Sequence, residues 1–391
     1  MTSVTVQRWI SDQQRDIFEK LLRPATDQNR GWLIYAIDDA MHYDDIPLFN
    51  RGRHAFASDK IQDNIRYMLN AADFVVVTTQ YIKSYYNKKY GVPLENIIAV
   101  PNLLPKWWFG DRYDPEKKVQ QFQKFKARPR IGIVSSLSHY NIDNIRVSKD
   151  GKACRLNKDS DTGTETWTNQ DGKEVKFEDT DVITDDLDQI IDMIRETVSD
   201  FQWVFFGYAP PKLKDLIEKK KIEYHPGVPI LNYPSVIENL RLQAVVAPIK
   251  DMEFNRCKSH IKFLECCASG IPLFASNYLP YSGVMKRDFL FDDGNELKEK
   301  LLRLKFMSAG AYRSIIEENW KWFNSKKIDG DFSIKNGWLE DNLNIWIDLF
   351  RLKPKAPTCS MQLFWEHKQE EDRKHRENMI FSDENGVEIL K

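Results

Sequence analysis

The sequence contains no apolar run of about 20 residues, the length that an α-helix needs to cross a bilayer, so no membrane span is expected. Its first residues lead into an alternating segment, not into a basic stretch followed by an apolar one, which argues against a secretory signal. Neither charge is in excess, because 57 basic and 58 acidic side chains give a formal net charge of -1. A general nucleic-acid binder usually carries a basic excess or stripe, although an enzyme can confine its basic surface to one groove. We therefore expect a cytoplasmic protein.

Cysteine is also scarce, with five residues whose odd number and spacing fit no zinc pattern. Two of them, Cys266 and Cys267, are adjacent within an apolar run, which is typical of buried free thiols in a reducing compartment. The sequence also lacks a dinucleotide fingerprint, a P-loop and a nucleophile elbow. Nothing therefore points to the enzyme classes that depend on those motifs.

What the sequence does contain is a series of short apolar runs, each followed by a helical pattern. With 391 residues the chain is long enough for two α/β domains. Strands that alternate with helices predict parallel sheets covered on both faces, so we expect two Rossmann-like, doubly wound domains. The predicted strands form two groups, at residues 4–7, 32–37, 74–77 and 97–100, and at residues 131–134, 203–206, 244–247 and 272–275.

A charged, turn-rich segment at residues 106–130 separates the two groups and predicts the interdomain linker. We expect the first domain at residues 1–127 and the second at residues 128–330. The remaining residues, 331–391, begin with aromatic side chains at near-helical spacing that we expect to pack back on the first domain. They end in a charged tail, in which residues 366–377 are expected to form a solvated helix or a partly disordered segment.

Residues 146–181 change to an alternating, polar pattern inside the second domain. An Asp-Gly pair ending at Gly172, flanked by alternating residues 164–168 and 174–177, predicts a β-hairpin. Because this segment interrupts the path from a strand to its next helix, we interpret it as an insertion. It would serve as a lid or a contact surface, or be a decorative loop.

The most informative stretch is residues 247–276, whose pattern indicates a strand, a polar loop, a helix and a strand. Free backbone N–H groups at a helix N-terminus, with lysines beside them, suit a diphosphate. Lys258 and Lys262 are four residues apart and share a helix face, and Glu265 falls near that face. Its acceptor-only carboxylate suits ribose hydroxyls. An amphipathic helix with solvated lysines and an i,i+3 ion pair is the alternative explanation.

Within this stretch, residues 262–265 (KFLE) and 268–272 (ASGIP) resemble the donor-site signature of retaining B-fold glycosyltransferases, the glycogen- and sucrose-synthase-like family. The resemblance implies that Glu265 binds the ribose of a nucleotide sugar and that the preceding polar loop contacts diphosphate and sugar. The donor-binding residues expected in that loop and helix are Arg256, Lys258, Ser259 and Lys262.

The resemblance extends over residues 30–300 and adds further candidates. Residues 129–139 resemble the opening strand and small-residue loop of the donor domain, where small residues let a backbone approach phosphate or sugar. Ser135 and Ser136 are donor-binding candidates in that loop. Gly207 ends a strand that resembles the one before the base-binding region, and Tyr233 lies where such enzymes contact the base.

The chain departs from the family in two respects. Many members have a first glutamate eight positions before the second, and here that position is Cys257. The first domain is also short, which indicates either an abbreviated domain or one completed by a partner chain. The short domain, the aromatic content and the unusual hairpin resemble bacteriophage glycosyltransferases, some of which modify hydroxymethylated DNA bases.

Three residues are candidates for catalysis. Asp38 and Asp39 follow a predicted strand, at the edge where open α/β sheets bind ligands, and would act as an acceptor-side base or bind hydroxyls. The same pair could instead cap the next helix. His139, in the small-residue loop, would touch the diphosphate or the acceptor, unless it is a structural histidine. A metal site is the alternative for the dense cluster of Asp38, Asp39, His42, Asp44 and Asp45. We expect no metal ion, because the B-fold transferases that the chain resembles do not generally need one.

The predicted function is transfer of a sugar from a nucleotide sugar to an acceptor hydroxyl, and the resemblance implies that the anomeric configuration is retained. UDP is the nucleotide expected, no further cofactor is needed, and DNA is one acceptor compatible with the resemblance. A homo-oligomer or a completing partner chain is compatible with the short first domain. Two alternatives remain, a non-catalytic transferase-like binding or assembly protein and a sugar-nucleotide epimerase on the same scaffold.

Overall fold

The computed structural model describes residues 4–22, 32–110, 112–149, 152–158, 165–169, 172–329 and 332–351. The predicted charged segment at residues 366–377 and one of the cysteines, Cys359, lie outside these ranges. Within them the other four cysteines are buried and free, as predicted. None of the helices in these ranges is long and apolar enough to cross a membrane.

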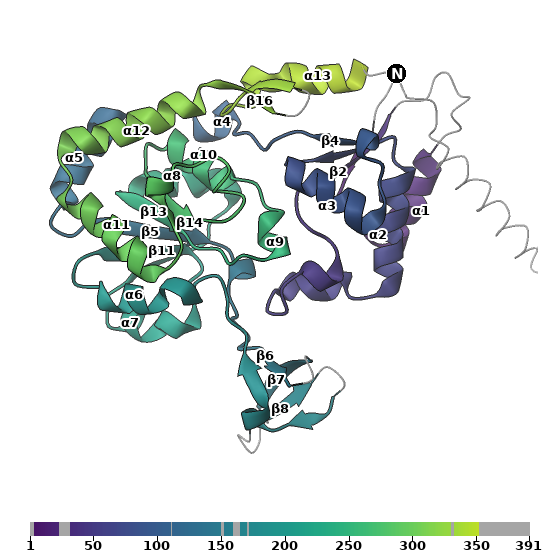
Figure 1. The fold of residues 1–391 in the computed structure, drawn as a ribbon, viewed down its shortest axis with the longest axis horizontal. Helices are drawn as coiled ribbons and strands as arrows, with labels where there is room; N and C mark the ends of the chain where they lie inside the picture. Colours follow the sequence, from purple (N-terminus) through teal and green to yellow (C-terminus); the bar gives the residue numbers. More distant parts are fainter. Residues whose placement is uncertain are drawn as a thin grey trace, which may run out of the picture.

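Four parallel strands form the first sheet, in the order β1-β2-β3-β4 (Figure 1). The strands are β1 (Val4–Gln7), β2 (Leu33–Ile37), β3 (Phe74–Val77) and β4 (Ile97–Ala99), and the helices between them are α1 (Asp12–Leu21), α2 (Asp59–Ala71) and α3 (Gln80–Tyr90). Side chains of Ser11, Ser58 and Thr79 cap the starts of these helices. Because the strand order follows the chain order, right-handed crossovers place all three helices on one face of the sheet.

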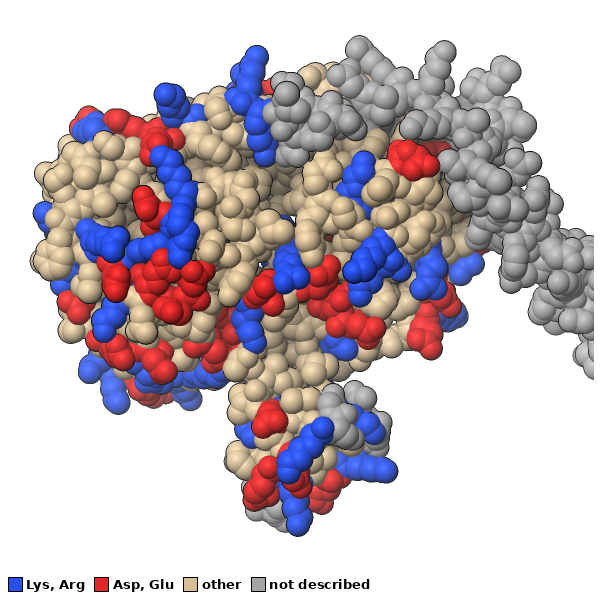
Figure 2. Space-filling model, viewed as in Figure 1, with Lys and Arg blue, Asp and Glu red and all other residues tan. Residues whose placement is uncertain are grey.

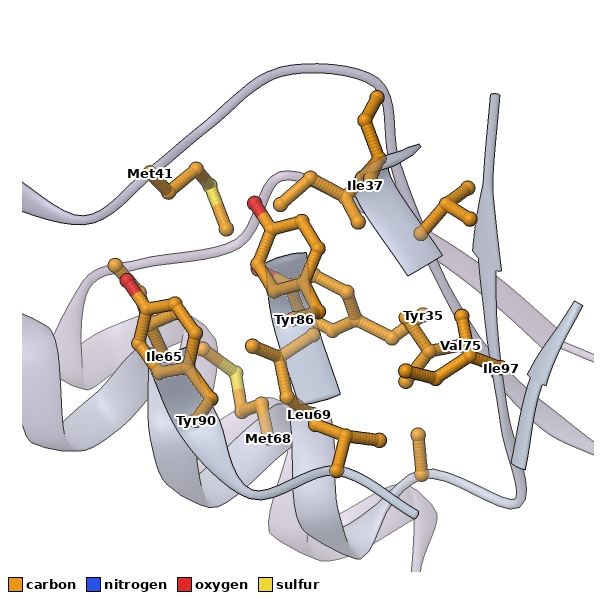
Figure 3. Close-up of a cluster of buried hydrophobic side chains, with 14 of the residues drawn as sticks. Tyr35, Ile37, Met41, Ile65, Met68, Leu69, Val75, Tyr86, Tyr90 and Ile97 are labelled. Carbon is orange, nitrogen blue, oxygen red and sulfur yellow. The ribbon is translucent and has the colours of Figure 1, made fainter. Parts of the chain in front are cut away.

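The core on that helical face is built from alternate strand residues. Tyr35 and Val75 point toward the helices, where they meet Met68 of α2 and Tyr86 of α3 in one buried cluster (Figure 3). Every second strand residue is therefore assigned to this core, and the residues between them must be covered from the other side.

The opposite face of the first sheet is covered by residues from the far end of the described chain. Ile34, Phe74 and Val76 form a buried cluster with Ile334 and Ile345. The last two lie on β17 (Phe332–Lys335), which pairs with β16 (Lys326–Asp329), and on α13 (Leu343–Arg351). The first sheet thus lies between its own helices and this C-terminal segment (Figure 1).

Six parallel strands form the second sheet, in the order β12-β11-β5-β13-β14-β15. They are β5 (Arg130–Ser135), β11 (Gln202–Gly207), β12 (Glu223–Pro226), β13 (Ala244–Ala247), β14 (Leu273–Ser276) and β15 (Leu290–Phe291). From β5 the chain first adds β11 and β12 on one side, and then β13, β14 and β15 on the other. Because the direction reverses, helices cover both faces of the sheet. The point where the direction changes, between β5 and β13, is where doubly wound sheets usually bind ligands.

Nine helices of the described residues lie around the second sheet. They are α4 (Lys106–Phe109), α5 (Pro115–Phe125), α6 (Ile191–Glu196), α7 (Lys214–Glu218), α8 (Tyr233–Asn239), α9 (Glu253–Arg256), α10 (Ile261–Ala268), α11 (Gly294–Phe306) and α12 (Ala309–Phe323). Phe122 of α5 stacks on Tyr312 of α12, with ring centroids 4.2 Å apart. Residues 115–125 therefore lie with the second sheet, although sequence reasoning put the first domain up to residue 127.

The predicted insertion forms a five-stranded antiparallel sheet of its own, in the order β10-β6-β7-β8-β9. The expected hairpin is the pair β8 (Glu165–Asn169) and β9 (Glu174–Val175), whereas β6 (Arg146–Ser148), β7 (Ala153–Lys158) and β10 (Thr180–Val182) were not predicted. In Figure 1 this sheet lies below the two domains, at the end of two connecting segments that leave the second domain. Arg51 of the first domain forms an ion pair with Asp143 at its base, with 2.5 Å between nitrogen and oxygen.

Candidate functional site

A cleft of about 660 Å³ opens at the carboxyl ends of β5 and β11. Seven residues singled out from the sequence line it, namely Ser135, Ser136, His139, Gly207, Tyr233, Lys262 and Glu265. They come from two strand ends, one loop, α8 and α10, so the fold brings together residues that are far apart in the chain. Its position beside the β5–β13 switch point is the one expected for a ligand.

The floor of the cleft depends on a close approach between two strands. Gly207 ends β11 opposite Ser135 at the end of β5, and its φ of 101° lies in the region that favours glycine. A Cβ atom at this position would meet the carbonyl oxygen of Ser135 well inside van der Waals contact. Glycine is therefore required both for the backbone conformation and for the space.

We expect Gly207→Ala to lower the free energy of unfolding by about 1–3 kcal/mol, through backbone strain and the clash with Ser135. Gly91→Ala is a matched control, because Gly91 also has a positive φ, of 72°, but has open space where the Cβ would lie. Urea titrations of both variants would measure the difference. Equal losses would show that the close approach at Gly207 adds nothing to the backbone strain.

A three-membered hydrogen-bond network forms one wall of the cleft. The Lys262 ammonium donates to Glu265 at 2.6 Å and to the Tyr233 hydroxyl at 2.8 Å, and that hydroxyl donates to Glu265 at 2.7 Å. Burial alone would lower the pKa of Lys262, but the Glu265 carboxylate outweighs it and raises the pKa well above its ordinary value. Burial and the same carboxylate raise the pKa of Tyr233. The network is therefore a fixed ion pair with a protonated phenol.

The rest of that wall is aromatic. The rings of Phe206 and Tyr233 stack with centroids 5.6 Å apart, and the ring centroid of Trp108 lies 6.0 Å from that of Tyr233. The indole nitrogen of Trp108 donates to the carbonyl oxygen of Ile230 at 2.8 Å, which fixes the ring at the rim. The sequence did not identify Trp108 as a site residue, because Trp107 and Trp108 lie in the segment predicted to be the interdomain linker. Such a surface suits a flat, partly apolar group beside a carboxylate.

A smaller cavity of about 60 Å³ continues the cleft toward the switch point. It shares Ser135, His139 and Lys262 with the cleft and adds Asp186 and Tyr281. Asp186 was not singled out from the sequence, because an Asp-Asp pair before a helix is a common start signal. Lys262 lies where the two cavities meet, so its charge is available to both.

The other three donor-binding candidates lie toward the first domain. Arg256 pairs with Asp251 at 2.6 Å, Lys258 lies 3.8 Å from Asp39, and Ser259 accepts a hydrogen bond of 2.8 Å from the Asn102 amide. Their segment turns away from the cleft lined by Lys262, because α9 inserts into the first domain. Phe254 and Cys257 of that segment belong to the first domain's apolar core.

The two aspartates proposed for catalysis share one partner. Arg8 donates to Asp38 at 2.5 Å and to Asp39 at 2.7 Å. Burial would lower the pKa of Arg8, but Asp39 and Asp38 raise it above its ordinary value. These carboxylates form a mixed-charge group with Arg8 and Lys258 where the two domains face each other. In the described ranges no three His, Cys, Asp or Glu side chains are arranged to hold a metal ion.

No protein-family model matches the sequence, and no curated protein matches it either. Among solved structures, a sucrose-phosphate synthase from Thermosynechococcus elongatus aligns with a TM-score of 0.50 at 12% identity, over 82% of this chain and 67% of that one. The parallel sheets and their arrangement match. The chain has the glycosyltransferase B fold.

Two other B-fold structures align less closely. HepE from Anabaena, in complex with UDP-glucose, gives a TM-score of 0.48 at 12% identity, over 82% of this chain and 72% of that one. TarM gives 0.48 at 15% identity, over 84% of this chain and 52% of that one. The chain thus spans about half the length of TarM.

Proposed function

We propose that this protein is a glycosyltransferase that transfers a sugar from a nucleotide sugar to an acceptor hydroxyl. The observation that carries the proposal is the Lys262–Glu265–Tyr233 network in the cleft at the carboxyl ends of β5 and β11. It places an acceptor-only carboxylate, a cation and an aromatic surface together. A nucleoside diphosphate sugar needs all three, for its ribose hydroxyls, its diphosphate and its base.

The roles follow from chemistry and position. Glu265 accepts hydrogen bonds from the ribose, while the Phe206 and Tyr233 rings support the base. Lys262 lies at the junction of the two cavities, where it stabilises the negative charge that grows on the leaving diphosphate. Small residues at Ser135 and Ser136 leave room for that diphosphate.

The proposal also covers the nucleotide, the stereochemistry and the acceptor. We propose UDP as the nucleotide and retention of the anomeric configuration, both supported by the sequence resemblance alone. Hydroxymethylated DNA is one acceptor to test, although Figure 2 shows acidic and basic side chains interspersed on the face in view, without a basic stripe. A cytoplasmic location, a phage origin and a completing partner chain stay predictions.

The first experiment is calorimetric titration with UDP, GDP, ADP, CMP and their common sugar conjugates, without added metal. We expect one nucleotide to bind, and Glu265→Gln to weaken it about tenfold to a hundredfold, because a charge-assisted hydrogen bond to the ribose is lost. Glu238→Gln is the control, since that glutamate also pairs with a cation, Arg112 at 2.9 Å, but lies outside the cleft. Binding of no nucleotide, or an equal effect of both variants, would contradict the assignment.

A second candidate function is a non-catalytic nucleotide-binding protein, and one observation favours it. Cys257 stands where many B-fold transferases have a sugar-binding glutamate, and its side chain is fully buried in the first domain's core. Burial also raises the pKa of this thiol, which keeps it neutral. Nucleotide binding without hydrolysis or transfer of any bound sugar would favour this candidate over the enzyme.

A further inference from the structure

A buried carboxylate lies directly behind the cleft. Asp186 is 2% exposed, and its Oδ2 lies 2.7 Å from Nδ1 of His139. Its Oδ1 accepts hydrogen bonds of 2.8 Å from the backbone N–H of Lys250 and from the side-chain amide of Asn255. Both oxygens are therefore occupied by donors, as an ionised carboxylate requires when it is buried.

This arrangement determines how His139 presents its ring. A carboxylate only accepts hydrogen bonds, so Nδ1 carries the hydrogen that points to Asp186. The remaining polar atom of the ring is Nε2, which in the neutral imidazole is an acceptor. His139 lines both the cleft and the smaller cavity, so this acceptor is available to a bound ligand.

Asp186 connects three parts of the molecule through its carboxylate and its backbone. The backbone N–H of Asp186 donates to the carbonyl of His139 at 3.3 Å, which holds the loop after β5 against the segment that returns from the insertion. Asn141 strengthens this junction, because its backbone N–H donates to Asp185 at 2.9 Å. Asn255 belongs to α9, whose neighbours Phe254 and Cys257 lie in the first domain's core.

We propose that Asp186 is the positioning residue for His139, holding the ring in the Nδ1–H tautomer so that Nε2 accepts a hydrogen bond from a hydroxyl of the transferred sugar. The inference rests on the proposed glycosyl transfer. It assigns no bond-breaking step to Asp186, which acts only through the imidazole. His139 touches the sugar, whereas Asp186 fixes the orientation of the His139 ring and keeps the hydrogen on Nδ1.

The substitution Asp186→Asn tests this with little change of shape. Lys250 N–H and the Asn255 amide still need an acceptor, so the new amide oxygen must face them and its NH₂ group must face Nδ1. That donor forces His139 into the Nε2–H tautomer and replaces the acceptor in the cleft by a donor. We expect kcat for sugar transfer or donor hydrolysis to fall by about tenfold. UDP affinity should stay within about twofold.

The decisive readouts are the ¹⁵N shifts of the imidazole ring and a double-mutant cycle. The chain has seven histidines, and His139→Gln identifies the signal that belongs to His139. We expect this signal to change from the Nδ1–H to the Nε2–H pattern in Asp186→Asn, and the same substitution to have no further effect on kcat in the His139→Gln background. An unchanged tautomer, or an equal loss of kcat in that background, would overturn the proposal.

These outcomes also separate the inference from the proposed function. If the wild-type protein neither hydrolyses nor transfers any nucleotide sugar, the glycosyltransferase proposal fails, and the assignment of a sugar hydroxyl to His139 fails with it. The ¹⁵N shifts still decide whether Asp186 sets the tautomer. If Asp186→Asn also abolishes UDP binding and lowers Tm, Asp186 is only a structural residue.

Discussion

Lys262→Met should lower kcat by about 10²–10³-fold, the loss typical of removing one group that stabilises charge in a transition state. The Lys262 ammonium lies at the junction of the two cavities and is held by Glu265 and Tyr233, so it needs no rearrangement to face a leaving diphosphate. Methionine keeps most of the side-chain length and removes the charge. The measurement is steady-state release of the nucleotide from the donor that binds in calorimetry.

The variant also leaves Glu265, which is only 12% exposed, without its cation. An unpaired buried charge destabilises a protein, so Tm should fall in Lys262→Met and recover in the double variant Lys262→Met, Glu265→Gln. The rate should not recover, because the cation is still missing. If stability and rate recover together, the lysine supports the fold and does not act on the diphosphate.

Ile334→Ala should lower the free energy of unfolding by about 2–5 kcal/mol, as expected for a large-to-small change in a core. Ile334 is 1% exposed and packs with Ile34, Phe74 and Val76, so the cavity would open directly on the first sheet. Urea unfolding followed by tryptophan fluorescence would report it, since Trp32 belongs to the same cluster.

Leu343→Ala is the matched control for this change. Leu343 lies on α13 but is 49% exposed, so its truncation should cost about 0.5 kcal/mol or less. A small loss in both variants would mean that the outer face of the first sheet does not depend on the C-terminal segment.

Most strands of the two parallel sheets could be predicted because they are short, continuous apolar runs, as at Phe74–Val77, and such runs need burial on both faces. The edge strands β12 (Glu223–Pro226) and β15 (Leu290–Phe291) were not predicted, because the first is mainly polar and the second has only two residues. The other strands of the insertion could not be predicted. In β7 (Ala153–Lys158), for example, polar and charged residues interrupt the apolar ones, and the strand depends on its antiparallel partners. The sequence predicted that residues after 330 pack on the first domain, but it did not predict that a strand, β17, takes part. β17 has no local signal that identifies a sheet from the other end of the chain as its neighbour.

The same limits apply to the site. Lys262 and Glu265 could be placed together because they share one turn of α10, and Ser135 and Gly207 because parallel strands end at one edge. The direction of the segment before α10 could not be predicted. The apolar pair Phe254 and Cys257 shows a helix face that needs burial, but not that the first domain supplies it.

The covering of the first sheet also constrains the order in which this protein can mature. β1 to β4 leave the ribosome more than 200 residues before Ile334 and Ile345, the residues that complete their outer face. Multidomain chains generally fold their N-terminal domain during synthesis. Here that domain would keep Phe74 and Val76 exposed to water until residues 334–345 have been synthesised, and apolar surface exposed in this way favours aggregation.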